Sequence, residues 1–266
     1  MSPRQVKTWG GVGVEGLRER WGRDSVYAYG EVGSTSAIAR ELADQGADDG
    51  TLVLARSQTA GRGRAGRGWF SPEGGLYLSV LFRPPRPDVP ALVTILAGLG
   101  VAIELSRRVP GAAVAIKWPN DLVVDGRKLG GILAETHAGD DGKPRLVVGV
   151  GVNVASTGWP RSLAGRVVAL EELAPVSLPE VADAVIAGLE RWLPDVPDTL
   201  TPAQLEELDQ RDWLKNRRIA LDTGGEEPLV GQGAGIAPDG ALLFRPDRGA
   251  LRRVTSGSIE VLAEGQ

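Results

Sequence analysis

The sequence predicts an α+β protein in which helices flank a mixed β-sheet, followed by a small all-β domain. Short β-rich runs bounded by Gly, Pro, Asn or Asp recur through residues 1–215. Amphipathic helical segments lie between groups of these runs without alternating strictly with them, which favours a mixed sheet over a doubly wound one. After Asn216 only short strands follow. We therefore expect a core at residues 1–215 and a small β-domain at 216–266.

The expected strands of the core are short and begin and end at turn-forming residues. The run Leu76–Phe82 is almost entirely apolar, which is typical of a strand covered on both faces. The full set is Ser25–Gly30, Thr51–Ala55, Leu76–Phe82, Val114–Trp118, Leu122–Asp125 and Leu146–Val154.

Four helices are expected from apolar spacing and capping residues. Ser177 and Glu180 have the spacing of a capping box, and Thr201 is suited to cap the helix that follows it. These helices are Ser34–Ala47, Pro90–Arg108, Leu178–Leu193 and Pro202–Leu214. The C-terminal strands are expected at Arg218–Leu221, Pro228–Ile236, Ala241–Phe244 and Leu251–Leu262.

The composition excludes several classes of protein. The chain has 266 residues, a net charge of −4, no cysteine and a single histidine, His137. Disulfides, thiolate metal sites and multi-histidine zinc sites are therefore excluded, and a Ser–His–Asp triad is improbable. The acidic balance argues against a dedicated nucleic-acid binder. Without a membrane span or a secretory signal, we expect a cytoplasmic protein.

The most informative segment is the Gly-Arg loop, Ser57–Trp69, in which four glycines alternate with three arginines. Such a loop can expose backbone N–H groups and bring several guanidinium groups onto one anion. It lacks the spacing of a Walker A loop or of a Rossmann fingerprint. The alternatives are a solvated loop or an RNA-contacting tract. Because the loop lies between two strands, we expect a lid that is open without ligand and closed over it.

A second segment joins KWPND, beginning at Lys117, to RKLGGILAE, beginning at Arg127. The turn at Asp125-Gly126 predicts a hairpin that returns Lys128 close to Asn120 and Asp121. Lysines together with Asn and Asp at a turn suit a nucleotide phosphate site. An ordinary polar hairpin is an equally good interpretation of the spacing alone.

Two shorter segments complete the set. In Val147–Val154 a glycine at every other position allows a backbone or a flat ligand to approach closely, and Asn153 at its end is either a strand-end hydrogen bonder or a ligand contact. Ser34-Thr35-Ser36 is typical of a helix N-cap, although hydroxyls at a helix start can also bind a small polar group.

Together these segments resemble the catalytic core of biotin protein ligases. The motifs GRGRAGRGW, KWPND, RKLGGILAE and GVGVNV have the family's order and approximate spacing over residues 28–155. The resemblance implies a class II synthetase-like core with a C-terminal SH3-like β-barrel. It also implies that biotin and Mg-ATP form biotinyl-5′-AMP, and that a lysine of a biotin carboxyl carrier domain takes the biotinyl group. Since only about 25 residues precede the first core strand, we expect a monofunctional ligase without a DNA-binding domain.

The resemblance also carries the family's contacts onto residues of this chain. Lys128 and Arg64 are the expected catalytic residues, and Ser36 stands where the family commonly has Asn. Biotin contacts are expected at Ser34, Thr35, Ser36, Gln58, Arg62, Gly63, Arg64 and Lys128. ATP or adenylate contacts are expected at Arg64, Arg67, Trp69, Lys117, Asn120, Asp121 and Asn153. No protein ligand is assigned to Mg²⁺, which is expected to bind the phosphates.

Other functions stay open at this stage. A lipoate–protein ligase would activate its acid as an acyl-adenylate in the same way. A Gly-Arg tract could also contact RNA in an RNA-binding module. A catalytically silent biotin sensor would have the same motifs. The expected partner is a carrier domain, with neither DNA nor a membrane as partner. A homodimer is an open alternative.

Overall fold

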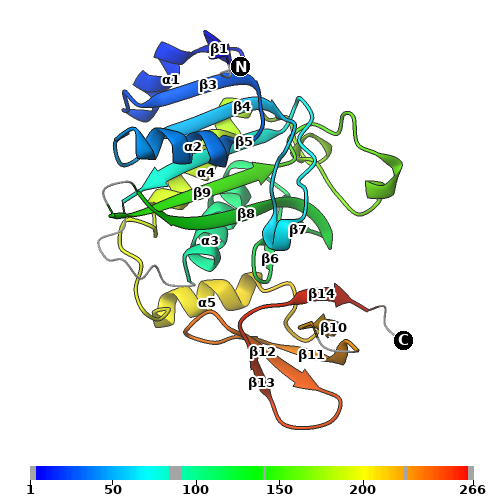
Figure 1. Ribbon diagram of the computed structural model, residues 1–266. Helices are drawn as coiled ribbons and strands as arrows, with labels where there is room; N and C mark the ends of the chain where they lie inside the picture. Colours follow the sequence, from blue (N-terminus) through cyan, green and yellow to red (C-terminus); the bar gives the residue numbers. More distant parts are fainter. Residues whose placement is uncertain (1–3, 84–91, 140–141, 225–226, 263–266) are drawn as a thin grey trace.

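The computed structural model describes residues 4–83, 92–139, 142–224 and 227–262. A seven-stranded sheet forms the centre of the molecule (Figure 1), in the order β3-β4-β5-β9-β8-β7-β6. Only β3 and β4 pair in parallel, so the predicted mixed sheet is confirmed. Its strands are β3 Val26–Val32, β4 Leu52–Gln58, β5 Leu76–Phe82, β6 Ala115–Lys117, β7 Asp121–Val124, β8 Arg127–Ala138 and β9 Pro144–Val152.

Helices cover both faces of this sheet. The helix α2 (Thr35–Asp44) packs on one face against β4, β5 and β9, while α3 (Leu92–Arg108) and α4 (Leu178–Glu190) pack together on the other. Every residue of β5 is buried, as the apolar run predicts. The expected helix from Pro90 begins at Leu92 within the described residues, because Pro90 lies outside them. None of the described helices is long and apolar enough to cross a membrane.

The capping prediction for α4 is confirmed. Glu180 accepts a hydrogen bond from the backbone N–H of Ser177 at 2.9 Å, and the Ser177 hydroxyl accepts one from the Glu180 N–H at 3.5 Å. The next helix, α5 (Pro202–Arg211), begins after Thr201 with the same reciprocal pattern. Satisfying the free N–H groups of the first turn is what makes these residues favourable at a helix start.

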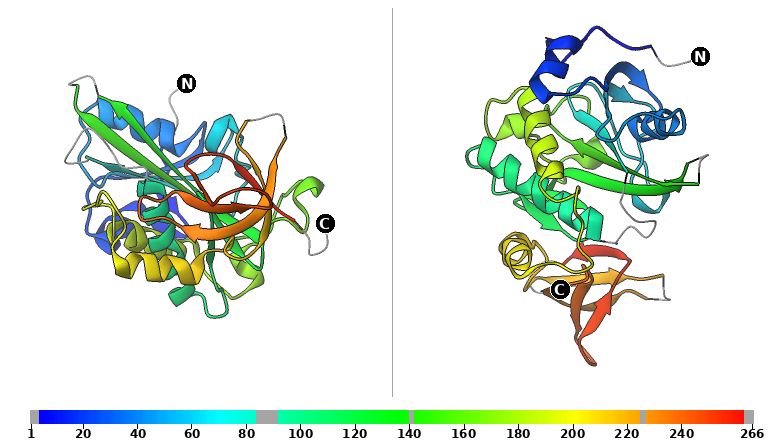
Figure 2. Two further views of the ribbon diagram at one scale, coloured as in Figure 1. Left: turned by 90° about the horizontal axis from the view of Figure 1, so that it is seen from below. Right: turned by 90° about the vertical axis from the view of Figure 1, so that its left-hand side faces the viewer.

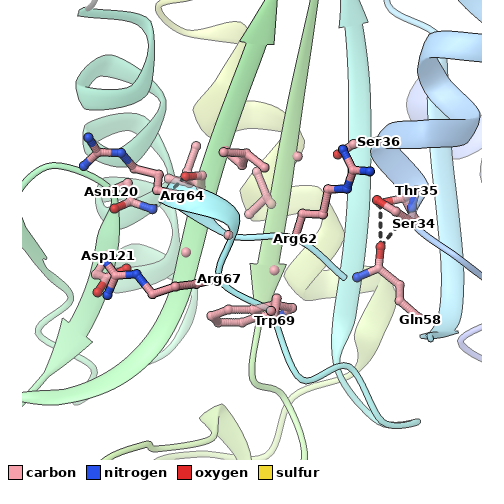
Figure 3. A pocket seen from close by; sticks show the side chains of 18 of the residues that line it. Ser34, Thr35, Ser36, Gln58, Arg62, Arg64, Arg67, Trp69, Asn120 and Asp121 are labelled. Atoms are coloured by element: carbon pink, nitrogen blue, oxygen red, sulfur yellow. Dashed lines mark hydrogen bonds between the residues drawn. The ribbon is translucent and has the colours of Figure 1, made fainter. Parts of the chain in front are cut away.

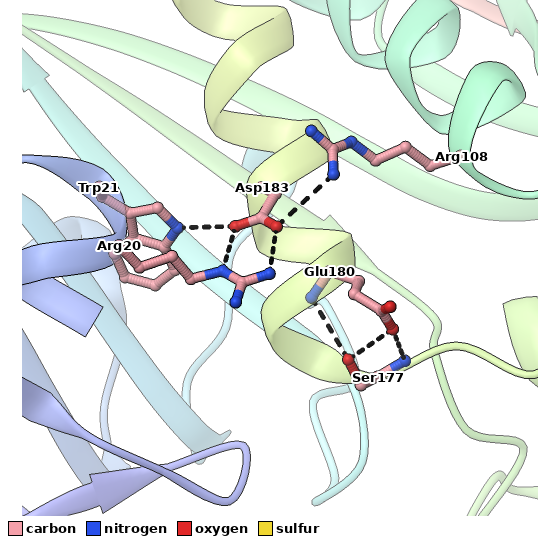
Figure 4. A network of polar contacts seen from close by, with 6 residues as sticks. All are labelled: Arg20, Trp21, Arg108, Ser177, Glu180 and Asp183. Carbon is pink, nitrogen blue, oxygen red and sulfur yellow. Dashed lines mark hydrogen bonds and ion pairs between the residues drawn. The ribbon is translucent and has the colours of Figure 1, made fainter. Parts of the chain in front are cut away.

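The N-terminal segment forms structure that the sequence patterns did not indicate. The strands β1 (Thr8–Trp9) and β2 (Val12–Gly13) form a hairpin that leads into α1 (Val14–Trp21). Asp183 of α4 anchors α1 (Figure 4), because it accepts hydrogen bonds from Arg20 at 2.6 and 2.8 Å and from Trp21 at 2.9 Å. Arg108 of α3 adds an ion pair at 3.5 Å. This network joins three helices at the periphery, away from the polar motifs.

A second sheet follows α5, with strand order β13-β12-β11-β10-β14 and antiparallel pairing throughout. The sheet confirms the prediction that the chain after residue 216 consists of β-strands. The described strand pairings do not close this sheet into a barrel. Its strands are β10 Arg218–Asp222, β11 Leu229–Ile236, β12 Leu242–Pro246, β13 Arg252–Val254 and β14 Ser258–Val261. The single strand expected at Leu251–Leu262 was wrong, since Gly257 at φ +153° separates β13 from β14.

The small sheet packs against one end of the core (Figure 2). The indole N–H of Trp118 donates to the carbonyl of Gly240 at 2.9 Å, and the Leu200 N–H donates to Pro238 O at 2.7 Å. One continuous hydrophobic cluster includes residues of both parts, among them Leu92 and Phe244. That residues 1–215 and 216–266 are separate domains therefore stays a prediction.

Candidate active site

The predicted site residues meet at one cavity of about 150 Å³ between the start of α2, the Gly-Arg loop and strands β8 and β9 (Figure 3). All eight expected biotin contacts line it, as do five of the seven expected ATP contacts. Lys117 and Asn153 are not on its wall. The predicted lining residues are Ser34, Thr35, Ser36, Gln58, Arg62, Gly63, Arg64, Arg67, Trp69, Asn120, Asp121 and Lys128.

The three hydroxyl residues at the start of α2 are buried and face the cavity. Ser34 occupies the N-cap position of α2, as predicted. Its side chain does not accept a hydrogen bond from the first turn of the helix, so the predicted capping hydrogen bond is wrong. Thr35 Oγ1 lies 2.8 Å from Ser79 Oγ, and Ser36 Oγ lies 3.1 Å from the same atom. Gln58 Oε1 accepts from the Thr35 N–H at 2.9 Å. These hydroxyl and amide groups are neutral, and the Arg62 side chain extends towards Ser36 beside them (Figure 3).

The Gly-Arg loop closes on itself through backbone hydrogen bonds. Trp69 N–H donates to Gly61 O at 2.9 Å, and Gly63 N–H donates to Arg67 O at 2.7 Å. A Cβ atom at Gly61 would lie 2.6 Å from the Trp69 carbonyl, so only glycine fits where the two arms of the loop meet. The loop thus projects its arginine side chains around the cavity (Figure 3). Whether it opens without ligand stays a prediction.

The glycines of β8 and β9 make room for the cavity floor. A Cβ atom at Gly151 would lie 2.6 Å from Nε1 of Trp69, and one at Gly149 would lie 2.6 Å from Ser36 Oγ. The glycines thus admit the flat ring of the chain's own Trp69, and the approach of a flat ligand to this strand stays a prediction. The buried indole Nε1 has no hydrogen-bond partner within the described part of the chain.

Lys128 returns to Asp121 as the predicted hairpin requires. Its ammonium lies 2.7 Å from Asp121 Oδ1 and 5.0 Å from the centre of the Trp69 ring. The Lys128 N–H donates to Arg166 O at 2.9 Å, and its carbonyl accepts from the Val168 N–H at 3.0 Å. The backbone that carries the ammonium is therefore held on both sides.

Asn153 supports Lys128 from behind the cavity wall. Its Nδ2 donates to the Lys128 carbonyl at 3.1 Å. Asn153 therefore makes a strand-end hydrogen bond, and its expected contact with ATP stays a prediction. Asn120 Nδ2 donates to Ile132 O at 3.0 Å, which orients the Asn120 side chain on β8.

Positive charge gathers around Asp121, which interacts with Lys128, Lys117 and Arg64. Burial lowers the pKa of Lys117, and neighbouring Lys128 lowers it further, while its cross-strand partner Asp121 raises it. Burial also lowers the pKa of Arg64, with a further lowering from Arg67. Arg67 in turn donates to Ser258 Oγ of β14 at 3.3 Å. An anion bound here would stabilise the charged forms of these side chains further than Asp121 does.

Two buried residues of the site, Ser79 and Ser71, were missed by the sequence interpretation. Ser79 is fully buried in β5, and Ser71 accepts from Gln58 Nε2 at 2.9 Å. The available signal was a lone serine within the apolar run LYLSVLF. In the part of the chain that the structure describes, no group of three or more His, Cys, Asp or Glu is placed to hold a metal ion.

Comparison with known proteins agrees with this geometry. The model of the biotin/lipoate A/B protein ligase family matches residues 31–153. The bifunctional ligase/repressor BirA of Bacillus spizizenii is 31% identical over 238 residues, covering 86% of this chain and 72% of the relative. The biotin–[acetyl-CoA-carboxylase] ligase of Mycobacterium tuberculosis is 33% identical over 221 residues, covering 80% of each. The chain belongs to the biotin/lipoate A/B protein ligase family.

A solved structure extends this relationship to the whole fold. The biotin protein ligase from Aquifex aeolicus, in complex with biotin and ATP, has a TM-score of 0.76 and 26% identity. The match covers 90% of this chain and 100% of the other. The mixed sheet with its flanking helices is thus the biotin protein ligase fold, and the small C-terminal sheet is consistent with the expected SH3-like domain.

Proposed function

We propose that the protein is an ATP-dependent biotin–protein ligase, which activates biotin as biotinyl-5′-AMP and transfers it to a lysine of a biotin carboxyl carrier domain. The observation that carries the proposal is the division of the cavity into two chemically different ends. Neutral hydroxyl and amide groups gather around Ser34 and Gln58, with the Arg62 side chain beside Ser36, while Arg67 extends towards Asp121 (Figure 3). Lys128 pairs with Asp121 there. A substrate with a neutral polar head and an anionic tail fits this division.

In the first step the biotin carboxylate oxygen attacks the α-phosphorus of ATP, and the bond to the β-phosphate oxygen breaks to release pyrophosphate. Both reactants are anions, so the main obstacle is charge repulsion. Lys128, Arg64 and Arg67 provide fixed positive charge where negative charge accumulates. Mg²⁺ bound to the phosphates would supply further neutralisation. No general base is needed, because a carboxylate is ionised at neutral pH.

In the second step the ε-amine of the carrier lysine attacks the acyl carbon of the mixed anhydride. The acyl–oxygen bond breaks, AMP leaves with its electron pair, and the amine loses a proton to form the amide. A mixed anhydride hydrolyses readily, so the site must exclude water until the amine arrives. The Gly-Arg loop lines the cavity and its arms meet at Gly61, so we infer that it covers the intermediate.

The partners follow from this chemistry. We infer that the acceptor is the carrier domain of a biotin-dependent carboxylase, and that the reaction takes place in the cytoplasm. We also infer that the described chain does not bind specific DNA or a membrane. A homodimer is compatible with the proposal and is tested by the mass of the protein in solution.

Pyrophosphate exchange into ATP tests the proposed activity. Exchange that depends on biotin, with none above background for lipoate, supports a biotin ligase. Exchange that depends on lipoate instead would assign the chain to the other branch of the family. No exchange with either acid, together with tight biotin binding, would favour a catalytically silent biotin sensor. RNA binding that weakens with salt, without exchange, would favour the RNA-binding alternative.

A further inference from the structure

A second hollow, of about 550 Å³, borders the active-site cavity between the Gly-Arg loop and β8. It is lined by residues 62–66 of the loop, by Thr94 of α3 and by residues 132–135 of β8. Arg62, Ala65 and Gly66 are exposed, so this hollow lies at the surface of the molecule. We call it the β8 groove.

The β8 groove meets the cavity along a shared wall. The residues that line both hollows are Arg62, Gly63, Arg64, Ile132 and Leu133. On this wall the Arg62 side chain extends beside Ser36, while Arg64 lies beside Asn120 (Figure 3). In the proposed reaction the acyl carbon of the mixed anhydride lies between the head group of biotin and the phosphate. The groove therefore reaches the cavity next to the reacting carbon.

The residues expected to hold biotin and ATP leave most of the β8 groove free. None of the hydroxyl residues at the start of α2 lines it, and of the seven expected ATP contacts only Arg64 does. The groove is therefore accessible when both halves of the intermediate occupy the cavity. The reactant that still has to reach the acyl carbon is the acceptor lysine, whose ε-amine is carried on a flexible four-carbon stem.

Glu135 is the carboxylate of the β8 groove. Its Oε2 is buried and has no hydrogen-bond partner within the described residues. Leu133, two positions earlier in β8, lines both hollows. Alternate residues of a strand project from the same face and are roughly 7 Å apart. Glu135 thus lies one such step from the wall that the groove shares with the cavity.

The charges of the groove set a condition on the attacking amine. Arg62 and Arg64 line the groove and disfavour a second cation beside them, so the lysine reaches the acyl carbon as the neutral amine. When its nitrogen bonds to the acyl carbon, that nitrogen becomes positively charged. Among the described residues that line the groove, Glu135 supplies the only negative charge that can stabilise it.

We propose that Glu135 is a catalytic residue of the second step, which stabilises and deprotonates the attacking nitrogen of the acceptor lysine. The nitrogen–carbon bond forms, the acyl–oxygen bond breaks, and AMP leaves with its electron pair. The proton on the nitrogen passes to the Glu135 carboxylate and from there to water in the groove. A carboxylate suffices as the base, because attack on the acyl carbon makes this proton much more acidic. The inference rests on the proposed function and deepens it by assigning the path and the base of the transfer step.

Glu135→Gln keeps the size of the side chain and removes its charge. Biotin-dependent pyrophosphate exchange should not change, because the first step does not use Glu135. The single-turnover rate of transfer from preformed biotinyl-5′-AMP to the carrier domain should fall by roughly 100-fold, as for the loss of one general base. Glu104→Gln is the matched control, since Glu104 bonds Arg107 at 2.8 Å on α3 and lines neither hollow.

Three further measurements distinguish proton transfer from a structural role. The loss in Glu135→Gln should shrink as the pH is raised from about 7 to about 9.5, because hydroxide then replaces the carboxylate as the base. Glu135→Asp, which keeps the charge, should retain more transfer than Glu135→Gln. Hydroxylamine, a weakly basic nucleophile that needs little help in losing a proton, should consume the bound adenylate at the same rate in every variant.

The outcomes separate the inference from the proposed function. Unchanged transfer to the carrier domain in Glu135→Gln overturns the role of Glu135 and leaves the proposed function intact. Equal losses of exchange and transfer, a loss that is the same at every pH, or equal losses in Glu135→Asp and Glu135→Gln also overturn it, because the glutamate would then be structural. If the unmodified chain shows no biotin-dependent exchange, the proposed function itself fails.

Discussion

The ammonium of Lys128 lies 2.7 Å from the carboxylate of Asp121, and Asp121 is also the cross-strand partner of Lys117. One carboxylate is therefore next to two lysines, of which Lys128 lines the cavity and Lys117 does not. In the absence of substrate Asp121 offsets part of this positive charge. In the proposed reaction the carboxylate of biotin and the α-phosphate of ATP would meet here, and the excess of cations would be available to them.

Lys128→Ala should impair adenylate formation far more than folding. The side chain is partly exposed, and its removal leaves the backbone bonds to Arg166 and Val168 in place. We expect biotin-dependent pyrophosphate exchange to fall by roughly 100-fold or more, as for the loss of one preorganised electrostatic contact worth about 3 kcal/mol. Lys215→Ala, which removes a surface lysine paired with Asp209, is the control. Unchanged exchange in a variant of unchanged Tm would refute the role of Lys128.

Arg64→Gly should release the intermediate. Arg64 is half-buried on the Gly-Arg loop, and it lines the cavity. Without it we expect adenylate still to form but to escape and label lysines of an unrelated protein such as albumin, which a biotin blot detects. Arg56→Gly is the control, because that arginine bonds Thr8 outside the cavity. Labelling no greater than that of the unmodified chain, with adenylate still produced, would show that Arg64 does not retain the intermediate.

Gly151→Ala should displace Trp69 from the cavity floor. The added Cβ would lie 2.6 Å from the indole nitrogen, so the ring must move. We expect biotin affinity to fall at least tenfold, and tryptophan fluorescence to lose its response to biotin. Gly13→Ala is the control, since a Cβ at that position meets no atom within 4 Å. Biotin affinity equal to that of Gly13→Ala would contradict the placement of Trp69.

Asp212 should destabilise the protein at neutral pH. Burial raises the pKa of Asp212 to about 6, and its Oδ2 lacks a hydrogen-bond partner within the described residues. Because the pKa of Asp212 is higher in the folded state than in the unfolded state, the folded state binds one more proton between about pH 4 and pH 6. The contribution of Asp212 to the free energy of unfolding is therefore full below about pH 4 and is lost as the pH rises through about 6. A shift of about two pKa units is worth up to about 3 kcal/mol.

Asp212→Asn should therefore raise the free energy of unfolding at pH 7.5, and the gain should disappear below about pH 4. Urea titrations at several pH values measure this difference. The exposed Asp24→Asn variant serves as the control for the loss of one negative charge. A gain that is independent of pH, or a loss at pH 7.5, would show that Asp212 is not held in a raised-pKa environment.

Much of the core and most of the site could be predicted from local patterns. The apolar run of β5 and the capping box of Ser177 each depend on neighbouring residues, and the structure confirms both. The long strand β8 was missed because its glycines and polar residues interrupt the alternation of apolar and polar side chains that is typical of a strand. Ser79 contacts residues of α2 that lie more than forty positions away in sequence, and no local pattern contains such contacts.

The most direct test of the account is mass spectrometry of a biotin carboxyl carrier domain incubated with the protein, biotin and MgATP. The account predicts that the domain gains the mass of one biotinyl group, located on a single lysine, and that the gain requires ATP and is lost with Lys128→Ala. A carrier domain of unchanged mass, under conditions in which another biotin protein ligase modifies it fully, would contradict the proposed function.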